Sequence, residues 1–390
     1  MPILNRIAAF TPEMQAWRQD IHAHPELAFE EHRTSDLVAR RLAEWGIEVH
    51  RGLAGTGVIG VLRNGTSSRA IGLRADMDAL PMPEETGLPY ASRNPGRMHA
   101  CGHDGHTSML LGAAKYLAET KAFDGTVVFI FQPAEEAGGG GERMVQDGLF
   151  RRFPVEQVFA LHNDPTTPIG QAQAVAGPVL AAADPIAIRI RGKGAHAAQP
   201  HFGVDPILVG AQMITALHQV VSRRIDPLDS AVLSLCVFQG GTVGNVIPET
   251  ATIEGTVRTL RVATRDEMER IITKTVAGLA ALHDAEAELD YRRGYPPTVN
   301  DAAATDRAAL AASRVLGEGR VIREALPLMG AEDFSYMLLE RPGCFLRLGQ
   351  ADGAKGAVAC HNPRYDFNDD ALPVGASWFA TLVEQEMPRS

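Results

Sequence analysis

The stretch Thr126-Val-Val-Phe-Ile-Phe-Gln-Pro-Ala-Glu-Glu136 joins a short run of apolar, β-favouring residues to a pair of adjacent carboxylates. An apolar run of this length is typical of a strand that is buried on both faces of a sheet. A helix is predicted before it, over 107–119, and a short helix after the glycines at 138–141 leads to a strand over 158–162. This alternation of helices and buried strands predicts an α/β domain with a mixed sheet.

The residues before this stretch are predicted to form two helices and three strands. Thr11-Pro12-Glu13 is typical of a helix start and Gly46 of a helix end, so helices are expected over 11–24 and 31–45. Strands are expected over 47–50, 57–63 and 70–76. Asn64-Gly65 is typical of a two-residue hairpin, so the last two strands are expected to pair with each other.

A second group of elements follows in the order β-α-β-β-α-β, which is that of a ferredoxin-like unit. The predicted ranges are 186–191, 205–223, 231–238, 252–260, 265–283 and 286–291. Prolines at 178, 185, 296 and 297 flank the group, as is typical of a domain boundary. The sequence therefore predicts an inserted domain over 184–294, within a first domain made of 1–183 and 295–390.

The charge balance argues against a nucleic-acid partner. The 390 residues hold 37 Lys and Arg against 47 Asp and Glu, a net charge of −10, and no basic block could follow a phosphate backbone. The N-terminal sequence resembles no secretory signal, and no apolar run approaches the roughly 18 residues of a membrane span. The four cysteines are too few and too scattered for a disulfide framework, so we expect a cytoplasmic protein without a membrane role.

One nucleotide-binding motif is present but lacks its structural context. Gly55-Thr-Gly-Val-Ile-Gly60 has the spacing of a dinucleotide fingerprint. Only three residues separate Gly60 from the Asn64-Gly65 turn, so the glycines open a strand and not the helix that would hold a pyrophosphate. The sequence therefore does not predict a dinucleotide site.

The segment His99-Ala-Cys-Gly-His-Asp-Gly-His106 gathers three imidazoles, a thiol and a carboxylate within eight residues. This density of ligand side chains favours a metal site over histidines that meet by chance. A structural zinc knuckle would need a second ligand pair nearby, and the other candidates, Glu135-Glu136, His162 and His361, are distant in sequence. The two carboxylates are either a solvated acidic turn or the pair that metal-assisted hydrolysis needs, one to bind an ion and one to move protons.

The motifs as a set resemble the aminoacylase/carboxypeptidase family of two-metal amidohydrolases. Within it they are similar to the branch of hippurate hydrolases and indole-acetyl-amino-acid hydrolases. The resemblance runs in order over nearly the whole chain, through Trp17–Leu27, Leu73–Pro81, Met98–His106, Gln132–Glu136, Gly194–His201, Gly244–Pro248 and Gly330–Phe334.

The resemblance implies a centre of two divalent ions, Zn, Mn, Co or Ni, and a general base, Glu135. The implied metal ligands are Cys101, His103, Glu136, His162 and His361. Five protein ligands are too many for one open catalytic zinc but suit two ions with a water between them. Asp104 and His106 are expected to orient the ligands, or to serve the fold alone.

The resemblance also gives the inserted domain the role of a lid and a dimerisation domain. His196 would polarise the substrate carbonyl and Asn245 would help bind the substrate. Arg258 would hold the substrate carboxylate, unless it is simply a solvated strand residue. Either the domains must close, or a partner subunit must lend His196, and the resemblance implies a homodimer or a higher homo-oligomer formed through this domain.

We therefore expect hydrolysis of the amide bond of N-acyl-L-amino acids to a carboxylic acid and a free amino acid. The alternatives are a dipeptidase, an N-acetyl-diaminopimelate deacetylase, or a catalytically silent ligand-binding protein on the same scaffold. The presence of base, ligands and lid donors argues against the silent protein. Asp164, close to His162, departs from the branch and is expected to bear on metal preference or on the choice of acyl group.

Overall fold

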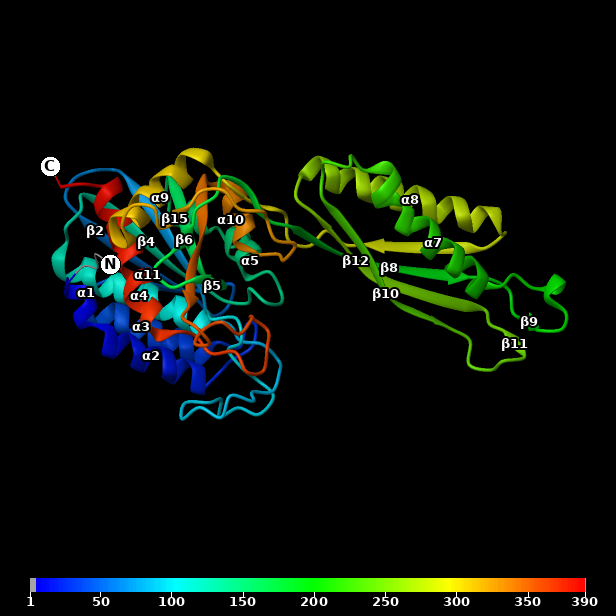
Figure 1. Cartoon of the computed structure of the whole chain (residues 1–390), viewed down its shortest axis with the longest axis horizontal. Helices are drawn as coiled ribbons and strands as arrows, with labels where there is room; N and C mark the ends of the chain where they lie inside the picture. Colours follow the sequence, from blue (N-terminus) through cyan, green and yellow to red (C-terminus); the bar gives the residue numbers. More distant parts are fainter. Residues whose placement is uncertain (1–4, 390) are drawn as a thin grey trace. The chain divides into compact units, whose positions relative to one another are not determined.

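This computed structural model describes residues 5–389, which divide into two units (Figure 1). Unit 1 comprises Met1–Gly177, Val299–Leu326 and Asp333–Ser390, and unit 2 comprises Pro178–Thr298 and Pro327–Glu332. The predicted inserted domain, 184–294, falls within unit 2. None of the helices in the described range is long and apolar enough to cross a membrane.

Unit 1 combines helices and strands, as expected for an α/β domain. Its helices are α1 (Asn5–Ala9), α2 (Thr11–Ala23), α3 (His32–Glu44), α4 (His103–Thr120), α5 (Gly140–Gln146), α6 (Leu149–Arg152), α9 (Ala302–Leu316), α10 (Phe334–Glu340) and α11 (Leu372–Glu386). Its sheet strands are β1 (Glu48–Leu53), β2 (Gly57–Asn64), β3 (Ala70–Asp76), β4 (Gly125–Gln132), β5 (Gln157–Pro168), β6 (Ala172–Gln173), β15 (Val321–Ile322) and β16 (Gly343–Ala351). Where the chain passes between the units, β7 (Gly177–Leu180) pairs with β14 (Thr298–Asn300).

The sheet of unit 1 is mixed and has the strand order β1-β2-β4-β3-β5-β16-β6-β15. The predicted hairpin between β2 and β3 is wrong, because β4 lies between them, antiparallel to β2 and parallel to β3. The Asn64 side chain donates to the carbonyl oxygens of Lys121 and Phe123, 3.0 and 2.6 Å away, just before β4 begins. The turn at Asn64-Gly65 is therefore tied to the entry of β4, and the chain leaves the sheet before it returns as β3.

Side chains of the central strands alternate between two apolar layers. On β4, Val127, Phe129 and Phe131 join the large core that α4 and α11 cover. On the opposite face, the guanidinium of Arg74 on β3 lies over the ring of Phe334 on α10. Both faces of the sheet are thus covered, which is the arrangement that the apolar run at 126–131 predicts.

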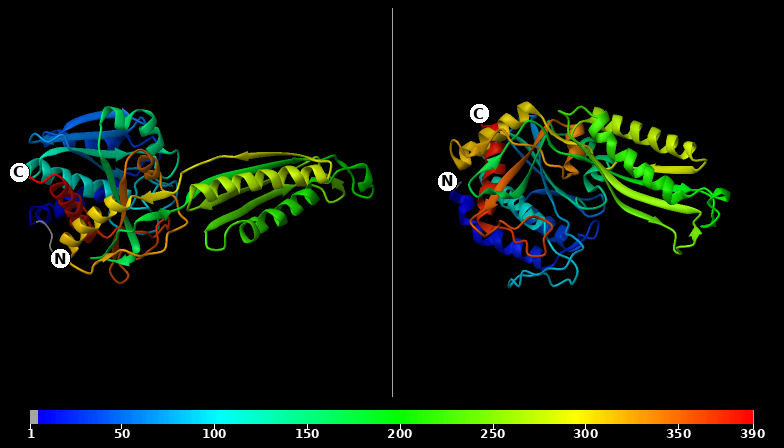
Figure 2. Two further views of the ribbon diagram at one scale, coloured as in Figure 1. Left: turned by 90° about the horizontal axis from the view of Figure 1, so that it is seen from above. Right: turned by 45° about the vertical axis from the view of Figure 1, so that its right-hand side comes forward.

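Unit 2 has the predicted ferredoxin-like order. Its elements are β8 (Ala182–Arg191), β9 (Ala195–His196), α7 (Pro206–Arg224), β10 (Ala231–Gly240), β11 (Val246–Ile247), β12 (Thr250–Thr259), α8 (Val262–Leu282) and β13 (Glu286–Tyr291). The main sheet is antiparallel with the order β10-β12-β8-β13, and α7 and α8 lie side by side on one face of it (Figure 2). Ile186, Ile188 and Ile190 of β8 point into the core beneath these helices.

Candidate metal centre

The carboxyl ends of β3 and β4 meet at one edge of the sheet in unit 1. Asp76, the last residue of β3, pairs in register with Gln132, the last residue of β4. The loop after β4 carries Glu135 and Glu136, and the first turn of α4 carries His103. Open α/β sheets bind their ligands at this kind of edge, because parallel strands end there and loops begin.

Helix α4 begins at His103, four residues before the predicted start at Thr107. Gly102 precedes it with a φ of +99°, and a Cβ on this residue would lie 2.1 Å from Oδ1 of Asn163. Only glycine fits there. The turn at Gly102 is what allows Cys101 and His103 to face the same site from either side of it.

The remaining two candidate ligands come from β5 and from the loop after β16. His162 lies in the middle of β5, opposite Arg347 of β16, and not at a strand end as predicted. Pairing with β16 continues the strand beyond its apolar part. His361 has a left-handed φ of +62°, and its backbone N–H donates to the carbonyl oxygen of Ala100 at 2.7 Å, which ties this loop to the segment just before Cys101.

The five predicted metal ligands and Glu135 form overlapping groups. In each group the ligand atoms lie within 4.8 Å of one another; the groups are Cys101, His103 and His162; Cys101, Glu136 and His361; and His103, Glu135 and Glu136. The Sγ atom of Cys101 is 3.4 Å from Nε2 of His162, and Nε2 of His361 is 3.2 Å from Oε1 of Glu136. Cys101 belongs to two of the groups, so its thiolate could be shared by two ions.

The hydrogen bonds of two histidines leave one ring nitrogen of each directed at this cluster. Nδ1 of His103 donates to the backbone carbonyl of Asp78 at 2.9 Å, and buried Nε2 has no hydrogen-bond partner among residues 5–389. Nδ1 of His162 donates to the carbonyl oxygen of Asn163 at 2.8 Å. These bonds fix the tautomer in which Nε2 carries the lone pair, as in most metal-bound histidines. The donor set therefore fits a metal centre.

Carboxylates surround Nε2 of His103. Asp76, Glu135 and Glu136 each place an oxygen within 4.0 Å of it. Burial acts to lower the pKa of His103, but the charges of Asp76 and Asp78 raise it well above its ordinary value. Buried negative charge of this density requires cations, which protons or metal ions can supply.

The thiol of Cys101 is also held in its neutral form unless a cation binds. Its hydrogen bond with Cys360, its burial and the charge of Glu136 raise the pKa of Cys101 well above its ordinary value. A metal ion inverts this preference, because a coordinated thiol loses its proton. The described cysteines are all free, so no disulfide competes for this sulfur.

Asp104 and His106 are held by contacts with neighbouring side chains. Nδ1 of His106 lies 2.6 Å from Asp76, and Nε2 lies 2.7 Å from Oδ1 of Asn163. Oδ2 of buried Asp104 lies 2.9 Å from Nδ1 of His22 and 3.7 Å from Arg18. Both residues are thus placed to brace the first turn of α4.

Asp78, in the segment Leu73–Pro81, supports two candidate ligands, a role that the sequence did not predict for it. Its carboxylate accepts a hydrogen bond from the backbone N–H of Glu136 at 2.9 Å, and it lies 3.2 Å from Nδ1 of His103. One side chain thus connects two candidate ligands. The signal that could have found it is the motif Asp76-Met-Asp78 at the end of a buried strand, where carboxylates need partners.

Asp164 has a structural role that needs no metal. Its buried carboxylate accepts hydrogen bonds from Thr166, Thr167 and Gln173 and forms an ion pair with Arg347 at 2.9 Å. These contacts hold the end of β5 against β6 and β16. An effect on metal preference or on the acyl group stays a prediction.

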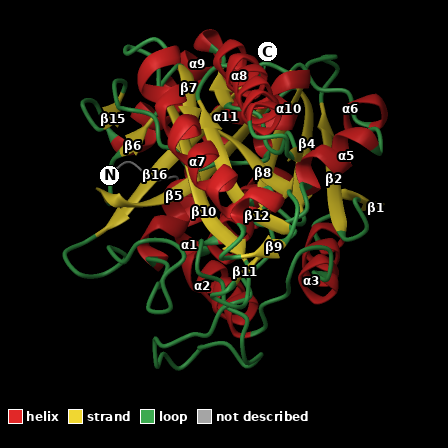
Figure 3. Cartoon of the chain, turned by 90° about the vertical axis from the view of Figure 1, so that its right-hand side faces the viewer, coloured by secondary structure: helices red, strands yellow, loops and turns green. Residues whose placement is uncertain are grey.

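In unit 2 the structure brings His196 and Asn245 together. His196 on β9 pairs with Val246 on β11, and the backbone N–H of Ala197 donates to the carbonyl oxygen of Asn245 at 3.1 Å (Figure 3). Both side chains are exposed. Arg258 is not near them, because it lies at the opposite end of β12, about 26 Å along the strand from Thr250.

Comparisons with known proteins agree with this geometry. The chain matches the family described as peptidase family M20/M25/M40 over residues 72–385. A hippurate hydrolase of Campylobacter jejuni is 40% identical over 383 residues, which cover 98% of this chain and 99% of the relative. The IAA-amino acid hydrolase ILR1-like 2 of Arabidopsis thaliana is 40% identical over 386 residues, which cover 97% of this chain and 87% of the relative.

A solved structure gives the same result for the fold. The Bacillus subtilis YXEP protein, a dinuclear metal-binding peptidase from the M20 family, is similar with a TM-score of 0.84 and 35% identity, covering 96% of this chain and 98% of its own. The resemblance that the sequence motifs indicated, including its branch, is confirmed by these relatives. The chain therefore belongs to peptidase family M20/M25/M40.

Proposed function

We propose that this chain is a two-metal amidohydrolase that cleaves the amide bond of N-acyl-L-amino acids, either hippurate-like compounds or other acyl-amino-acid conjugates. The products are a carboxylic acid and a free amino acid. The observation that carries the proposal is the cluster of Cys101, His103, Glu136, His162 and His361 beside Glu135 at the end of the sheet. Relatives at 40% identity over nearly the full chain, a hippurate hydrolase and an IAA-amino acid hydrolase, support the substrate class.

The proposed ligands divide between two divalent ions that share Cys101. Cys101, His103 and His162 form one group, and Cys101, Glu136 and His361 form the other. When bound, the two ions supply Lewis-acid polarisation of the amide carbonyl and make water a better acid at neutral pH. Mixed sulfur, nitrogen and oxygen ligands are compatible with Zn, Mn, Co or Ni.

Glu135 is proposed to move the protons. Its carboxylate is largely buried and lies 4.0 Å from Nε2 of His103, at the edge of the ligand cluster. From there it would take a proton from the attacking water and deliver it to the leaving amine nitrogen. A carboxylate suits both steps, because it accepts the first proton as a base and returns it as an acid.

Three residues of unit 2 are proposed to act on the substrate: His196 and Asn245, which are exposed, and Arg258, which is partly buried. His196 and Asn245 would donate hydrogen bonds to the oxygen of the scissile carbonyl, and Arg258 would bind the substrate carboxylate. Arg258 lies about 26 Å along β12 from the end of the main sheet of unit 2 that is near His196. A small N-acyl amino acid cannot contact both ends of the same sheet. We therefore propose that His196 and Asn245 act on a partner subunit's substrate, in a homodimer.

Strand β10 supports this assembly. It is the edge strand of the lid sheet and carries exposed apolar residues such as Phe238, with Val243 just beyond it. An unpaired edge of this kind is suited to pairing with a second copy. We further propose a cytoplasmic location, because the thiol of Cys101 must stay reduced to bind metal.

The proposal is tested by measuring release of free amino acid from benzoyl-, acetyl- and indole-acetyl-amino acids, with each metal supplied in turn. We expect hydrolysis of at least one series, and no hydrolysis by the Glu135→Gln variant. Turnover of dipeptides or of N-acetyl-diaminopimelate alone would assign the chain to the corresponding alternative. Binding of both metals without turnover of any of these amides would indicate the catalytically silent protein.

A further inference from the structure

Glu31 links three segments of unit 1 that are far apart in the sequence. It directly precedes α3 and is 0% exposed. Its Oε1 accepts hydrogen bonds from the backbone N–H groups of Phe29 at 3.0 Å and of Ala134 at 2.9 Å. Its Oε2 accepts a hydrogen bond from the hydroxyl of Thr56 at 2.5 Å. The segment that follows Ala134 carries the proposed base and one proposed ligand.

Both amides bound by Glu31 belong to residues with left-handed backbone. Phe29 has a φ of +63° and Ala134 a φ of +56°. Residues with a Cβ disfavour this conformation, and they keep it only where the surroundings hold them. Six non-glycine residues of the described chain have a positive φ, and Glu31 binds two of them. Its carboxylate is thus placed to maintain this geometry.

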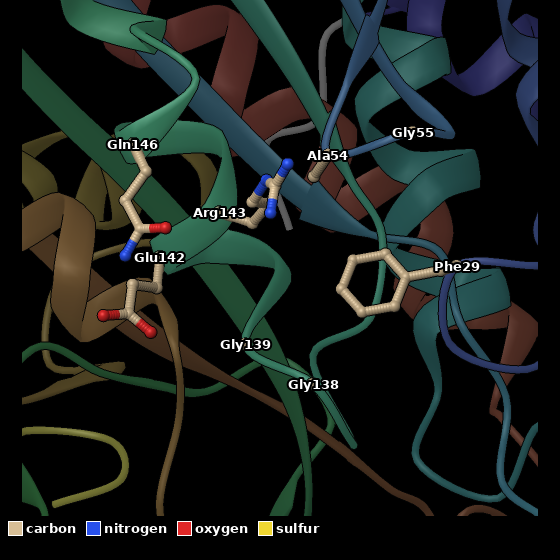
Figure 4. A pocket seen from close by; sticks show the side chains of 8 residues that line it. All are labelled: Phe29, Ala54, Gly55, Gly138, Gly139, Glu142, Arg143 and Gln146. Atoms are coloured by element: carbon tan, nitrogen blue, oxygen red, sulfur yellow. The ribbon is translucent and has the colours of Figure 1, made fainter.

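Phe29 holds the same loop at its other end. A Cβ on Gly138 would lie 2.5 Å from the Phe29 ring, so ring and backbone are in close contact. Phe29 and Gly138 both line an open pocket of about 470 Å³, which α5 borders with Glu142 and Gln146 (Figure 4). The loop from Ala134 to Gly138 is therefore fixed at both ends by contacts that depend on the segment 29–31.

The stability of the fold does not by itself explain why a carboxylate occupies position 31. Glu31 forms no ion pair with a Lys, Arg or His within the described range, so nothing of opposite charge offsets its burial. Burial raises the pKa of Glu31 to about 7, against the hydrogen bonds from Thr56 and from the backbone. A buried polar group of this kind is costly, and an apolar side chain of the same size commonly stabilises a core more.

We propose that Glu31 is a positioning residue of the active site, whose hydrogen bond to Ala134 sets the direction of the Glu135 and Glu136 carboxylates. This inference rests on the proposed function, in which Glu135 is the base and Glu136 a ligand. Glu31 itself touches neither the metal ligands nor the substrate. Its effect passes through the backbone of Ala134.

Glu31→Met is the test, with Glu26→Met as its matched control. Methionine is close to glutamate in length and volume but has no oxygen that could accept from the backbone N–H of Ala134. The Glu26 carboxylate also accepts two backbone N–H bonds, from Arg33 at 2.8 Å and Thr34 at 2.9 Å, without contacting the loop. We expect Glu31→Met to lower kcat about 10- to 100-fold with KM nearly unchanged, and Glu26→Met to leave kcat near wild type.

Amide hydrogen exchange of the metal-loaded protein provides the readout that does not depend on activity. Exchange at Ala134 and its neighbours should quicken in Glu31→Met and should stay slow in Glu26→Met and in Glu135→Gln. If no amide substrate is found, the proposed function fails, but the exchange result still tests the link from Glu31 to the loop.

Thr56→Val serves if Glu31→Met does not fold, because it removes one bond to Glu31 and keeps the volume of the side chain. It should lower kcat several-fold and quicken exchange at Ala134. Wild-type kcat together with unchanged exchange at Ala134 in the variant that folds would overturn the proposal. A loss of kcat that is explained by a smaller folded fraction, and that Glu26→Met reproduces, would overturn it as well.

Discussion

The Sγ atom of Cys101 lies 3.4 Å from Nε2 of His162, although one residue comes from the turn before α4 and the other from the middle of β5. The same sulfur lies within 4.8 Å of ligand atoms of Glu136 and His361. Cys101 is thus the one proposed ligand that the two groups have in common. The assignment of two metal ions to this centre depends on this sulfur.

Replacing Cys101 with alanine should remove metal from the protein. Both proposed ion positions lose a ligand at once, so we expect a loss of affinity of at least 10-fold, as seen when ligands or their supports are removed. Elemental analysis after dialysis measures it. Cys344→Ala, at a fully buried position in β16, and Cys236→Ala, at an exposed one, are the controls. Equal metal loss in the three variants would contradict the assignment of Cys101.

Glu135→Gln and Glu136→Gln should separate the base from the ligand. Glu135→Gln is expected to keep both metals and to lower kcat by orders of magnitude, because the amide cannot take a proton. Glu136→Gln should lose metal as well, because its carboxylate faces His361 at 3.2 Å. Metal content and steady-state kinetics of the two variants decide this. If they exchange behaviours, the two assignments are reversed.

His196→Ala should keep both metals and lower kcat about 10²- to 10³-fold, the effect of losing one oxyanion donor. Arg258→Ala should act mainly on KM, because it binds a part of the substrate that does not react. If His196 acts across a symmetric dimer, mixing inactive His196→Ala and Glu135→Gln subunits should restore about a quarter of wild-type activity. A wild-type kcat in His196→Ala would show that His196 takes no part in catalysis. If mixing the two variants restores no activity, His196 acts in the site of its own subunit.

The buried His22 should make stability fall as the pH rises above neutrality. Burial acts to lower its pKa, but hydrogen bonds to Asp104 and Glu84 overcome this and raise the pKa to about 9. Because its pKa is higher in the folded protein than in the unfolded chain, where it is about 6.5, protonated His22 stabilises the fold by about 3 kcal/mol. This contribution is complete below pH 6.5 and is lost as the pH rises through about 9.

Denaturant unfolding of wild type and His22→Gln, each at a series of pH values, measures this contribution. The difference in unfolding free energy between them should shrink between pH 6.5 and pH 9 as His22 loses its proton. Taking the difference at each pH cancels the pH dependence of metal binding that both proteins share. A difference that stays constant over this range would show that His22 keeps one charge state.

Local patterns predicted much of this molecule. The apolar run at 126–131 and the order of elements over 186–291 predicted a covered mixed sheet and a ferredoxin-like unit, because burial and periodicity are local properties. The ligand side chains were found from their density in His99–His106 and from their resemblance to a family.

Long-range pairing was predicted less well. Asn64-Gly65 indicated a hairpin, but nothing local tells that β4 enters between β2 and β3. His162 looked like a strand end because its apolar neighbours stop there, whereas pairing with β16 extends β5 to Pro168. The carboxylates of Asp78 and Glu31 accept hydrogen bonds from backbone N–H groups in the loop after β4, and a sequence does not display such bonds.

The central claim is a centre of two divalent ions held by five side chains of one chain. The most direct test is the metal content of fully active, metal-replete enzyme, with Glu135→Gln measured beside it. We expect two ions per chain in both proteins. One ion per chain in a preparation with full activity would contradict it.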